Sequence, residues 1–345
     1  MKKTILFTLS SPSKDSAIKT AEICTLEQLK NEYKIRIISY GDFYFNNIIS
    51  ALKKLYKSVK DISAIKYDLL HVNTAYDKKA VIRDFIFLLL LKKNGKIFFK
   101  YHGSKPFIAK NIIFRFFTRV IIRRIDGFGF LSNDEMLQYK KWFINDRKYY
   151  IIKNSVKDGK FISKSSSVFR ILFIGRVIKT KGILDLIQSI DLLNIDKNNL
   201  HVDIIGDGEL LNNIKNMCTN IECIEVHGRI SEFDALKYYK NCDLLVLPTY
   251  HDEGLPNVVL KSLSFGKPII TTRIRGMKHY LNDENAIFVK RESPSEIARA
   301  IEKLYNDYSF RKKIAMNNFK LAPIFYAQNV AREYNAIYRK VISNE

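Results

Sequence analysis

Short apolar segments alternate with helical segments along the whole chain of 345 residues. Nearly continuous apolar strands that are separated by helices predict parallel sheets with helices on both faces. The rhythm stops at a polar, serine-rich stretch, 157–167, and then restarts, so the strands form two series. We expect strands at 4–9, 34–40, 67–72, 96–101, 127–131 and 149–152, and then at 168–174, 201–205, 223–227, 244–247, 268–271 and 286–289.

The expected fold class is therefore α/β, with two doubly wound, Rossmann-like domains that face each other across a cleft. The boundaries that we predict are 1–155 for the first domain, 156–325 for the second and 326–345 for a terminal helix. Apolar residues recur in that helix at helical spacing. Because it has no obvious place on the second sheet, we expect it to cross back and pack on the first domain.

Composition excludes several classes of protein. A hydrophobic content of 47% argues against a disordered chain. The four cysteines form no C-x-x-C pair and few histidines lie near them, so they indicate buried thiols in a reducing compartment and no metal site. The first apolar run stops at Leu9, which favours a strand over a signal peptide. The longest apolar run, 85–91, is too short to span a bilayer.

Positive charge is concentrated in the first half of the chain. Residues 1–155 hold 30 lysines and arginines against 13 aspartates and glutamates, a net charge of +17, whereas 156–345 carry +6. Arg115, Arg119 and Arg123 recur at helical spacing beside a run of Phe and Ile side chains. A basic amphipathic helix of this kind lies on an anionic membrane surface, or else packs in a core with a solvated polar edge. Both interpretations stay open for this helix.

Several loops that follow strands of the second series carry phosphate-binding chemistry. In "FIGRVIKTKG", Gly175 and Arg176 end a strand and Lys181 precedes a helix, which suits a diphosphate because the helix N-terminus adds partial positive charge. In "IIGDGEL", Gly206 lets a backbone approach a ligand closely, although the third glycine of a dinucleotide fingerprint is missing. "VHGRIS" is a third loop of the same kind, with Arg229.

The fourth loop, in "PTYHDEGLPNVVLKSLSFG", places one carboxylate at the end of a strand. Glu253 stands ahead of Gly254 and Leu255, and Pro256 marks the start of the next helix. Backbone N–H groups at this position are expected to point into the cleft.

These stretches, in this order, resemble glycosyltransferase family 4, whose members are retaining enzymes of the GT-B fold. The resemblance runs from "FIGRV" at 173 through "DIIGDGEL", "VHGRI" and "DEGLPNVVLKSLSFGKPIITTRIRG" to "VAREYNAIYRKV" near the C-terminus. In the first half it is thinner and rests on segments such as "DLLHVN" and "KYHGSKPF".

The resemblance implies roles for single residues. Arg176 and Lys181 would hold the diphosphate of a nucleotide-sugar donor, UDP-linked, and offset charge on the leaving group. Glu253 would accept hydrogen bonds from the donor sugar, and His102 would lie beside that sugar from the first domain. The catalytic residues implied are therefore Glu253 and His102.

The remaining donor contacts that the resemblance implies are made largely by backbone groups. They would come from Gly175, Gly206, Gly254 and Leu255, with the loop at Arg229 contacting the base. The resemblance implies no bound metal or other cofactor, because the two cations of the diphosphate site replace it.

The sequence departs from the family at Lys261. The acidic motif of the family is Glu-x7-Glu, and its second glutamate accepts the ribose hydroxyls, whereas this chain has Glu253 followed by Lys261. A lysine only donates hydrogen bonds and cannot take that role. Another group or water then holds the ribose, or Lys261 contacts a phosphate, or donor binding is weak.

Charge and resemblance together predict a glycosyltransferase that extends a lipid-linked glycan in surface polysaccharide or glycoconjugate assembly. The first domain, with Arg115, Arg119 and Arg123, would face the acceptor and an anionic membrane, so the protein is expected in the cytoplasm, peripheral on the inner face of the cell membrane. Rival functions are a GT-B nucleotide-sugar epimerase, a non-catalytic sugar-nucleotide sensor and a nucleic-acid binder. The last lacks any recognised binding signature, so no nucleic-acid partner is expected.

Overall fold

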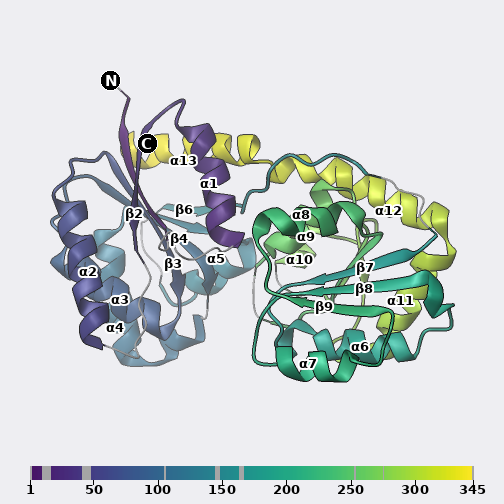
Figure 1. Ribbon diagram of the computed structural model, residues 1–345. Helices are drawn as coiled ribbons and strands as arrows, with labels where there is room; N and C mark the ends of the chain where they lie inside the picture. The colour runs from purple at the N-terminus through teal and green to yellow at the C-terminus, as the bar shows by residue number, and fades with distance from the viewer. Residues whose placement is uncertain are drawn as a thin grey trace. The chain divides into compact units, whose positions relative to one another are not determined.

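A computed structural model describes residues 2–9, 17–40, 48–104, 106–143, 148–162, 167–251, 254–274 and 276–343. The chain divides into two compact units. The first unit holds Met1–Ser155 together with Ala327–Glu345, and the second holds Val156–Tyr326. Figure 1 traces the chain through both, from purple at the N-terminus to yellow at the C-terminus.

The sheet of the first unit has six strands, all paired in parallel, in the order β2-β1-β3-β4-β5-β6. Its interior strands are buried along almost their whole length, as the apolar sequence runs predict. Its strands are β1 (Thr4–Leu9), β2 (Lys34–Ser39), β3 (Leu69–Tyr76), β4 (Lys96–Ser104), β5 (Gly127–Phe130) and β6 (Lys148–Ile151).

Helices cover both faces of this sheet, and each face has its own hydrophobic core. Side chains of α2, α3, α4 and α5 join the core on one face, and those of α1 and α13 join the core on the other. These layers are visible in Figure 1. The helices are α1 (Ala17–Leu29), α2 (Ile48–Ser63), α3 (Lys78–Leu90), α4 (Ile112–Arg124), α5 (Asn133–Lys140) and α13 (Ala327–Ser343), with a 3-10 turn, η1 (Pro106–Lys110).

The terminal helix α13 belongs to the first unit, where it lies beside α1. Val330, Tyr334, Tyr338 and Val341 are among its buried side chains, at helical spacing, and they pack against β1 and β4. The hydroxyl of Tyr338 lies 2.7 Å from Nδ1 of the buried His71. The expectation that the last helix crosses back onto the first domain is thereby confirmed.

The sheet of the second unit also has six parallel strands, in the order β12-β11-β10-β7-β8-β9. One continuous core surrounds it. Its strands are β7 (Phe169–Ile174), β8 (Leu200–Ile205), β9 (Ile224–Gly228), β10 (Leu244–Leu247), β11 (Ile269–Thr271) and β12 (Ile287–Phe288).

The helices of the second unit again lie on both sides of the sheet (Figure 1). Local signals set their ends: Ser231 caps α8 by accepting a 3.0 Å hydrogen bond from the N–H of Asp234, and Pro294 is the first residue of α11. They are α6 (Ile183–Asp191), α7 (Leu211–Cys218), α8 (Glu232–Asn241), α9 (Asn257–Ser264), α10 (Met277–Tyr280), α11 (Pro294–Asn306) and α12 (Tyr308–Leu321), with 3-10 turns η2 (Lys179–Lys181), η3 (Lys197–Asn199) and η4 (Ala322–Phe325).

Each sheet reverses its strand order once. In the first unit the reversal lies between β1 and β3, and in the second it lies between β7 and β10. The loops that follow such a strand pair leave the sheet in opposite directions, and the crevice between them is where open α/β sheets bind ligands. The topology therefore places the candidate ligand site of the second unit at the carboxyl ends of β7 and β10.

Candidate functional site

The loops after β7 and β10 carry the residues that the sequence indicates for phosphate binding. Gly175 and Arg176 directly follow β7, and Lys181 ends η2 just ahead of α6. The loop after β10 leads through Gly254 and Leu255 into α9. The fold thus brings together, at one switch point, segments about 75 residues apart in the chain.

His251 joins the two loops. Its Nε2 lies 2.7 Å from a guanidinium nitrogen of Arg176, and its Nδ1 lies 3.0 Å from the hydroxyl of Thr180. The backbone N–H of His251 also donates to the carbonyl of Thr180 at 2.9 Å. Since arginine only donates, Nε2 must accept and Nδ1 must carry the proton. A neutral His251 therefore holds the exposed Arg176 head group at the switch point.

Lys181 is buried, with 6% of its surface exposed, although it carries a charge. It stands at the N-terminal end of α6, where Gly182 adopts a left-handed conformation with φ 73°. The first turn of a helix has unpaired N–H groups and a partial positive charge. Lys181, Arg176 and the start of α6 thus present three sources of positive potential, an arrangement that suits a diphosphate.

The close contact between the loops after β7 and β8 requires a glycine at position 206. It has φ 145°, and a Cβ atom added there would lie 1.7 Å from the carbonyl oxygen of Gly175. The N–H of Gly206 donates to the carbonyl of Gly228 at 2.8 Å, and that of Gly175 donates to Ile205 at 3.0 Å. The backbones of Gly175 and Gly206 therefore lie against each other at the carboxyl ends of β7 and β8.

The backbone of Gly254 and Leu255 is supported from behind by Gly276. A Cβ atom at Gly276 would lie 2.2 Å from the carbonyl carbon of Gly254 and 2.5 Å from the nitrogen of Leu255. Leu255 itself is buried. Glu253, the carboxylate indicated by the sequence, lies outside the described residues.

Lys261 makes an ion pair with Glu232. Its ammonium group contacts a carboxylate oxygen of Glu232, and the two side chains are 12% and 30% exposed. Lys261 comes from α9 and Glu232 from the first turn of α8, directly after the loop that holds Arg229. Arg229 is itself exposed. The lysine that replaces the family's second glutamate thus has a carboxylate partner from the neighbouring helix.

In the first unit, His102 lies near the carboxyl end of β4 and is nearly buried, with 8% of its side chain exposed. Its Nε2 lies 2.6 Å from the Oδ1 of Asn73 and 3.5 Å from a carboxylate oxygen of Glu22. Its Nδ1 has no hydrogen-bond partner among the described residues. Burial, followed by the charge of Lys100, holds the pKa of His102 well below its usual range, so the ring is neutral. His102 is therefore a neutral imidazole whose Nδ1 is buried and is left without a hydrogen-bond partner among the described residues.

A buried ion pair supports this histidine. Lys100 is fully buried, and its ammonium group lies 2.7 Å from Glu22, 2.8 Å from the hydroxyl of Tyr334 and 3.4 Å from the Oδ1 of Asn154. Burial lowers the pKa of Lys100, and Glu22 opposes that effect. The group ties β4 to α1 and to α13.

Helix α4 has two different faces. Ile121 and Ile122 are buried in the core, whereas Ile112 and Phe116 are among the exposed apolar side chains. The helix therefore packs in the core along one face, as one of the two interpretations has it, and contact of the other face with a membrane stays a prediction.

The three arginines of α4 differ in their surroundings. Arg115 is half-buried, donates to the carbonyl of Ala109 at 2.9 Å and places its guanidinium group 5.3 Å from the ring centre of Trp142. Arg119 and Arg123 are exposed. Arg115 thus stabilises the local fold, while Arg119 and Arg123 lie at the surface.

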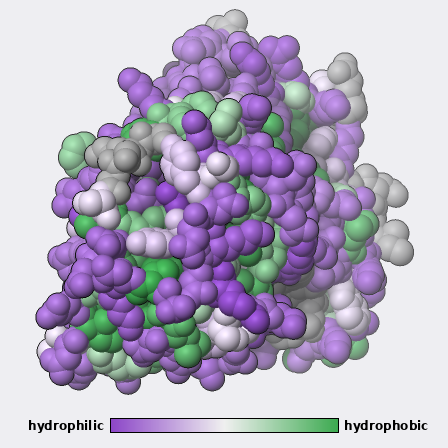
Figure 2. Space-filling model, turned by 90° about the vertical axis from the view of Figure 1, so that its right-hand side faces the viewer, coloured by the Kyte–Doolittle hydropathy of each residue, from purple (hydrophilic) through white to green (hydrophobic). Residues whose placement is uncertain are grey.

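No described helix is long and apolar enough to cross a bilayer. Figure 2, which views the molecule from the side of α11 and α12, shows a surface that is mostly hydrophilic with scattered apolar areas.

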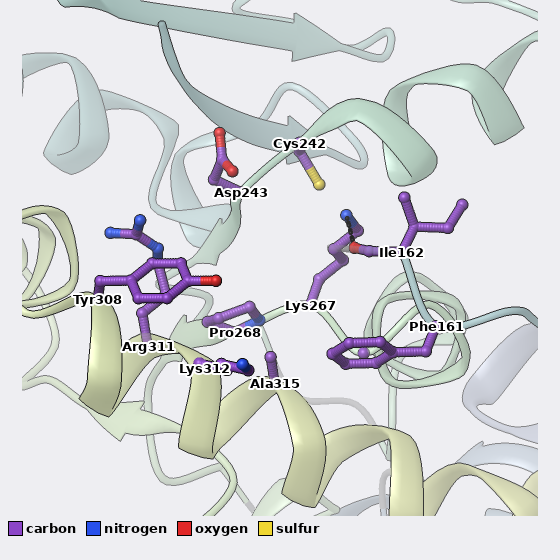
Figure 3. Close-up of a pocket in the computed structure, with 11 residues that line it drawn as sticks. Phe161, Ile162, Cys242, Asp243, Lys267, Pro268, Tyr308, Arg311, Lys312 and Ala315 are labelled. Atoms are coloured by element: carbon purple, nitrogen blue, oxygen red, sulfur yellow. Dashed lines mark hydrogen bonds between the residues drawn. The ribbon is translucent and has the colours of Figure 1, made fainter. Parts of the chain in front are cut away.

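A separate small cavity opens at the other edge of the second sheet, at the amino ends of β10 and β11 (Figure 3). The buried Lys267 lies there and donates to the carbonyls of Ile162 and Lys240 at 3.1 and 3.0 Å. Burial raises the pKa of the neighbouring Cys242 thiol to about 12. With a volume of about 40 Å³, the cavity is too small for a sugar.

Sequence reasoning missed His251 and Glu232. His251 stands two positions before Glu253, so its place in a strand-end loop was a usable signal. Nothing in the sequence pairs Glu232 with Lys261, because their contact depends on how α8 and α9 pack.

Comparison with known proteins bears on the activity. Residues 157–321 match the family described as Glycosyl transferases group 1. The chain is 26% identical to an uncharacterized glycosyltransferase of Methanocaldococcus jannaschii, over 90% of this chain and 87% of that one. It is 24% identical, over 91% of this chain and 87% of the other, to an α-1,4-N-acetyl-D-galactosaminyltransferase of Campylobacter jejuni that is named for a PP-undecaprenol-linked saccharide.

Solved structures show the same fold. Sucrose-phosphate synthase from Thermosynechococcus elongatus superimposes with a TM-score of 0.81 at 14% identity, covering all of both chains. Anabaena HepE in complex with UDP-glucose has a TM-score of 0.76 at 16% identity, covering 99% of this chain and 100% of that one. With two parallel six-stranded sheets and a terminal helix on the first unit, the chain has the GT-B fold. Its second unit, which holds the matched residues 157–321, belongs to the group 1 glycosyltransferases, glycosyltransferase family 4, a family of retaining GT-B enzymes.

Proposed function

We propose that this enzyme transfers a sugar from a UDP-sugar to a lipid-linked glycan, with retention at the anomeric carbon. The observation that carries the donor half is that Arg176 and Lys181 both lie between β7 and the N-terminus of α6, at the switch point of the second sheet. HepE, with the same fold, is described in complex with UDP-glucose, which supports a uridine nucleotide as the donor carrier.

The proposed chemistry follows from where charge develops. As the bond between the anomeric carbon and the diphosphate oxygen lengthens, negative charge accumulates on the diphosphate. Arg176 and Lys181 stabilise that charge, and His251 holds Arg176 in place beforehand. The N–H groups near Gly254 and Leu255 approach the sugar and phosphates, with Gly175 and Gly206 shaping the floor and the loop at Arg229 contacting the base.

Glu253 and His102 are the proposed catalytic residues. Glu253 is proposed to receive hydrogen bonds from donor-sugar hydroxyls, and His102 to lie beside the donor sugar. The proposal for His102 is supported by its Nδ1, which has no hydrogen-bond partner among the described residues. No second carboxylate is assigned as a covalent nucleophile. Acceptor attack therefore takes place on the face from which the diphosphate departs.

The ribose contact is proposed to come from Glu232. Lys261 cannot accept hydrogen bonds, but it holds the carboxylate of Glu232 at the start of α8, next to the Arg229 loop. Glu232 thus supplies the hydrogen-bond acceptor for the ribose that Lys261 cannot provide.

The proposal of a lipid-linked acceptor is supported by the surface of the first unit. Helices that follow parallel strands run back along the sheet, so α2, α3 and α4 all begin at its carboxyl edge. Exposed apolar side chains gather near the starts of α2 and α4, in company with exposed lysines and arginines: Ile49, Leu52 and Tyr56 on α2, and Ile112, Ile113 and Phe116 on α4.

We infer that this face rests on an anionic membrane, because each nearby cation contributes about 1 kcal/mol of attraction and the apolar side chains enter the interface. A peripheral enzyme on the inner leaflet reaches an acceptor whose lipid stays in the membrane. The Campylobacter jejuni relative named for a PP-undecaprenol-linked saccharide supports an acceptor of this class.

The donor is identified by incubating the protein with a panel of nucleotide sugars and measuring thermal stabilisation and donor hydrolysis. One UDP-sugar is expected to stabilise the protein and to be hydrolysed slowly without acceptor. Interconversion of the free nucleotide sugar would instead establish an epimerase, and stabilisation without turnover would establish a sensor.

Membrane attachment is tested by flotation with vesicles of anionic lipid. Binding is expected to fall steeply as salt rises, because surface attraction decays over a Debye length of about 8 Å at physiological ionic strength. Phe116→Ser and Arg119→Gln together should weaken binding and spare the donor site. Exchange of Phe233 for Ser, an exposed aromatic side chain of the second unit, is the matched control. Equal flotation of all proteins would exclude this face.

A further inference from the structure

Four side chains that the proposed transfer reaction does not use gather on one face of the second sheet. His201 and Asp203 lie two positions apart on β8, and Glu225 and His227 lie two positions apart on β9. Asp203 and Glu225 are direct partners in the strand register. Because strand side chains alternate between faces, the "HVD" and "EVH" segments place all four on the same side.

The spacing of three of these side chains matches a zinc site. His201 Nε2 lies 3.2 Å from the Oδ1 of Asp203 and 3.7 Å from the Oε2 of Glu225. One ligand atom from each of the three lies within 4.8 Å of the others. Two ligands that are each about 2.0 to 2.1 Å from a tetrahedral zinc ion lie about 3.3 Å apart. The observed separations therefore need only small side-chain adjustments.

His227 supports one ligand. Its Nε2 lies 2.7 Å from the Oδ1 of Asp203, and its Nδ1 lies 3.3 Å from the hydroxyl of Tyr238 on α8. Hydrogen bonds of this kind orient a carboxylate ligand and are typical of the groups around protein-bound metals.

The surroundings allow an ion to enter. The four side chains line an open pocket of about 540 Å³ on the edge strand β9, and α8 closes one side of it. Asp203 is 9% exposed and His227 is 13% exposed, whereas Glu225 is 60% exposed and lies at the mouth. The carboxylates of the lining outnumber its cations by one: Asp203, Glu225 and Asp243 against Arg170 and Lys237.

We propose that His201, Asp203 and Glu225 bind a zinc ion, with water as a fourth ligand and His227 orienting Asp203. Imidazole together with carboxylate favours zinc over magnesium, which prefers an all-oxygen octahedral shell. The bound ion joins the edge strand β9 to β8 and stabilises the second unit. It takes no part in the transfer chemistry, so this site stands or falls independently of the proposed function.

The test measures zinc binding by calorimetry and Tm by scanning calorimetry on the full chain, freed of metal by a chelator and dialysed. Zinc at about 100 times its dissociation constant should raise Tm of the second unit by about 5 to 10 °C, and magnesium should not. Asp203→Asn and His201→Gln should each weaken zinc binding at least tenfold. His279→Gln, at an exposed histidine on α10, is the matched control and should bind like the wild type.

Because Asp203 is buried, its replacement is paired with Glu225→Gln, whose exposed side chain is not needed for folding. A weakened zinc affinity in Glu225→Gln, with Tm of the metal-free protein unchanged, supports the site. The proposal is overturned if the wild type takes up no zinc, if magnesium binds equally well, or if His201→Gln and Glu225→Gln bind zinc as the wild type does.

Discussion

Replacing Lys100 by Met tests whether the buried ion pair of the first unit holds α1, β4 and α13 together. Lys100 is fully buried and Glu22 is 2% exposed, so the substitution leaves a buried carboxylate whose nearest remaining donor is the hydroxyl of Tyr334, at 3.1 Å. Removing one partner of such a pair costs about 3 to 5 kcal/mol, because the other charge stays buried without compensation. The loss should therefore be large for a single side chain.

Urea unfolding followed by Trp142 fluorescence measures this loss, since the only tryptophan of the chain lies in the first unit. With a slope of about 2 kcal/mol per molar urea, the midpoint should fall by about 1.5 to 2.5 M. Lys96→Met is the matched control on the same strand. Lys96 is 27% exposed and 3.5 Å from Asp126, so its loss should cost less than about 1 kcal/mol.

The double variant Glu22→Leu and Lys100→Met distinguishes loss of the ion pair from the cost of one buried, uncompensated charge. Removing both charges avoids the stranded carboxylate, so the double variant should be more stable than Lys100→Met alone. A midpoint for Lys100→Met within about 0.3 M of that for Lys96→Met would refute this account of the first unit.

Three further perturbations follow from the structure. Lys261→Met leaves Glu232 half-buried without its lysine and should lower UDP affinity and Tm modestly; unchanged values for both would show that Lys261 is only a surface residue. Burial lowers the pKa values of His71 and His102 well below 6.5, so both histidines take up protons when the protein unfolds in acid. The free energy of unfolding should therefore decrease as pH falls below about 6.5, by up to about 1.4 kcal/mol per pH unit for each histidine. His71→Gln should reduce that slope by about half, as measured by urea midpoints from pH 7.5 to 5.5. Gly276→Ala should weaken donor binding and lower Tm only slightly, because its Cβ displaces the backbone of the loop after β10. A wild-type dissociation constant for the donor would contradict the contact.

Sequence periodicity was sufficient for the fold class and for the two series of strands. The apolar strands and the serine-rich break predicted two parallel sheets, and the helical spacing of Tyr334 and Tyr338 predicted a terminal helix with one buried face. These features follow from side chains that are close in sequence. Strand order does not, since the reversals at β1/β3 and β7/β10 depend on the direction that each crossover takes.

Side-chain partners were the part that the sequence left undetermined. Arg176 meets His251 across 75 positions, and Lys261 meets Glu232 from a neighbouring helix, so neither pair has a local signal. On α4 the periodicity found the arginine stripe but could not show that Arg115 packs against Trp142. Burial and packing of helices decide such contacts, and one sequence records them only indirectly.

The most direct test of the central claim is the dissociation constant of UDP, measured by calorimetry for the wild type, Arg176→Ala, Lys181→Ala and Lys215→Ala. Lys215 is an exposed lysine on α7 and serves as the matched loss of one positive charge. Hydrogen bonds to charged groups contribute about 1.5 to 3 kcal/mol, so each of the first two variants should bind UDP about ten- to a hundredfold more weakly, and Lys215→Ala should bind it normally. Equal UDP affinity in all four proteins would contradict the assignment of the diphosphate to the loops after β7 and β10.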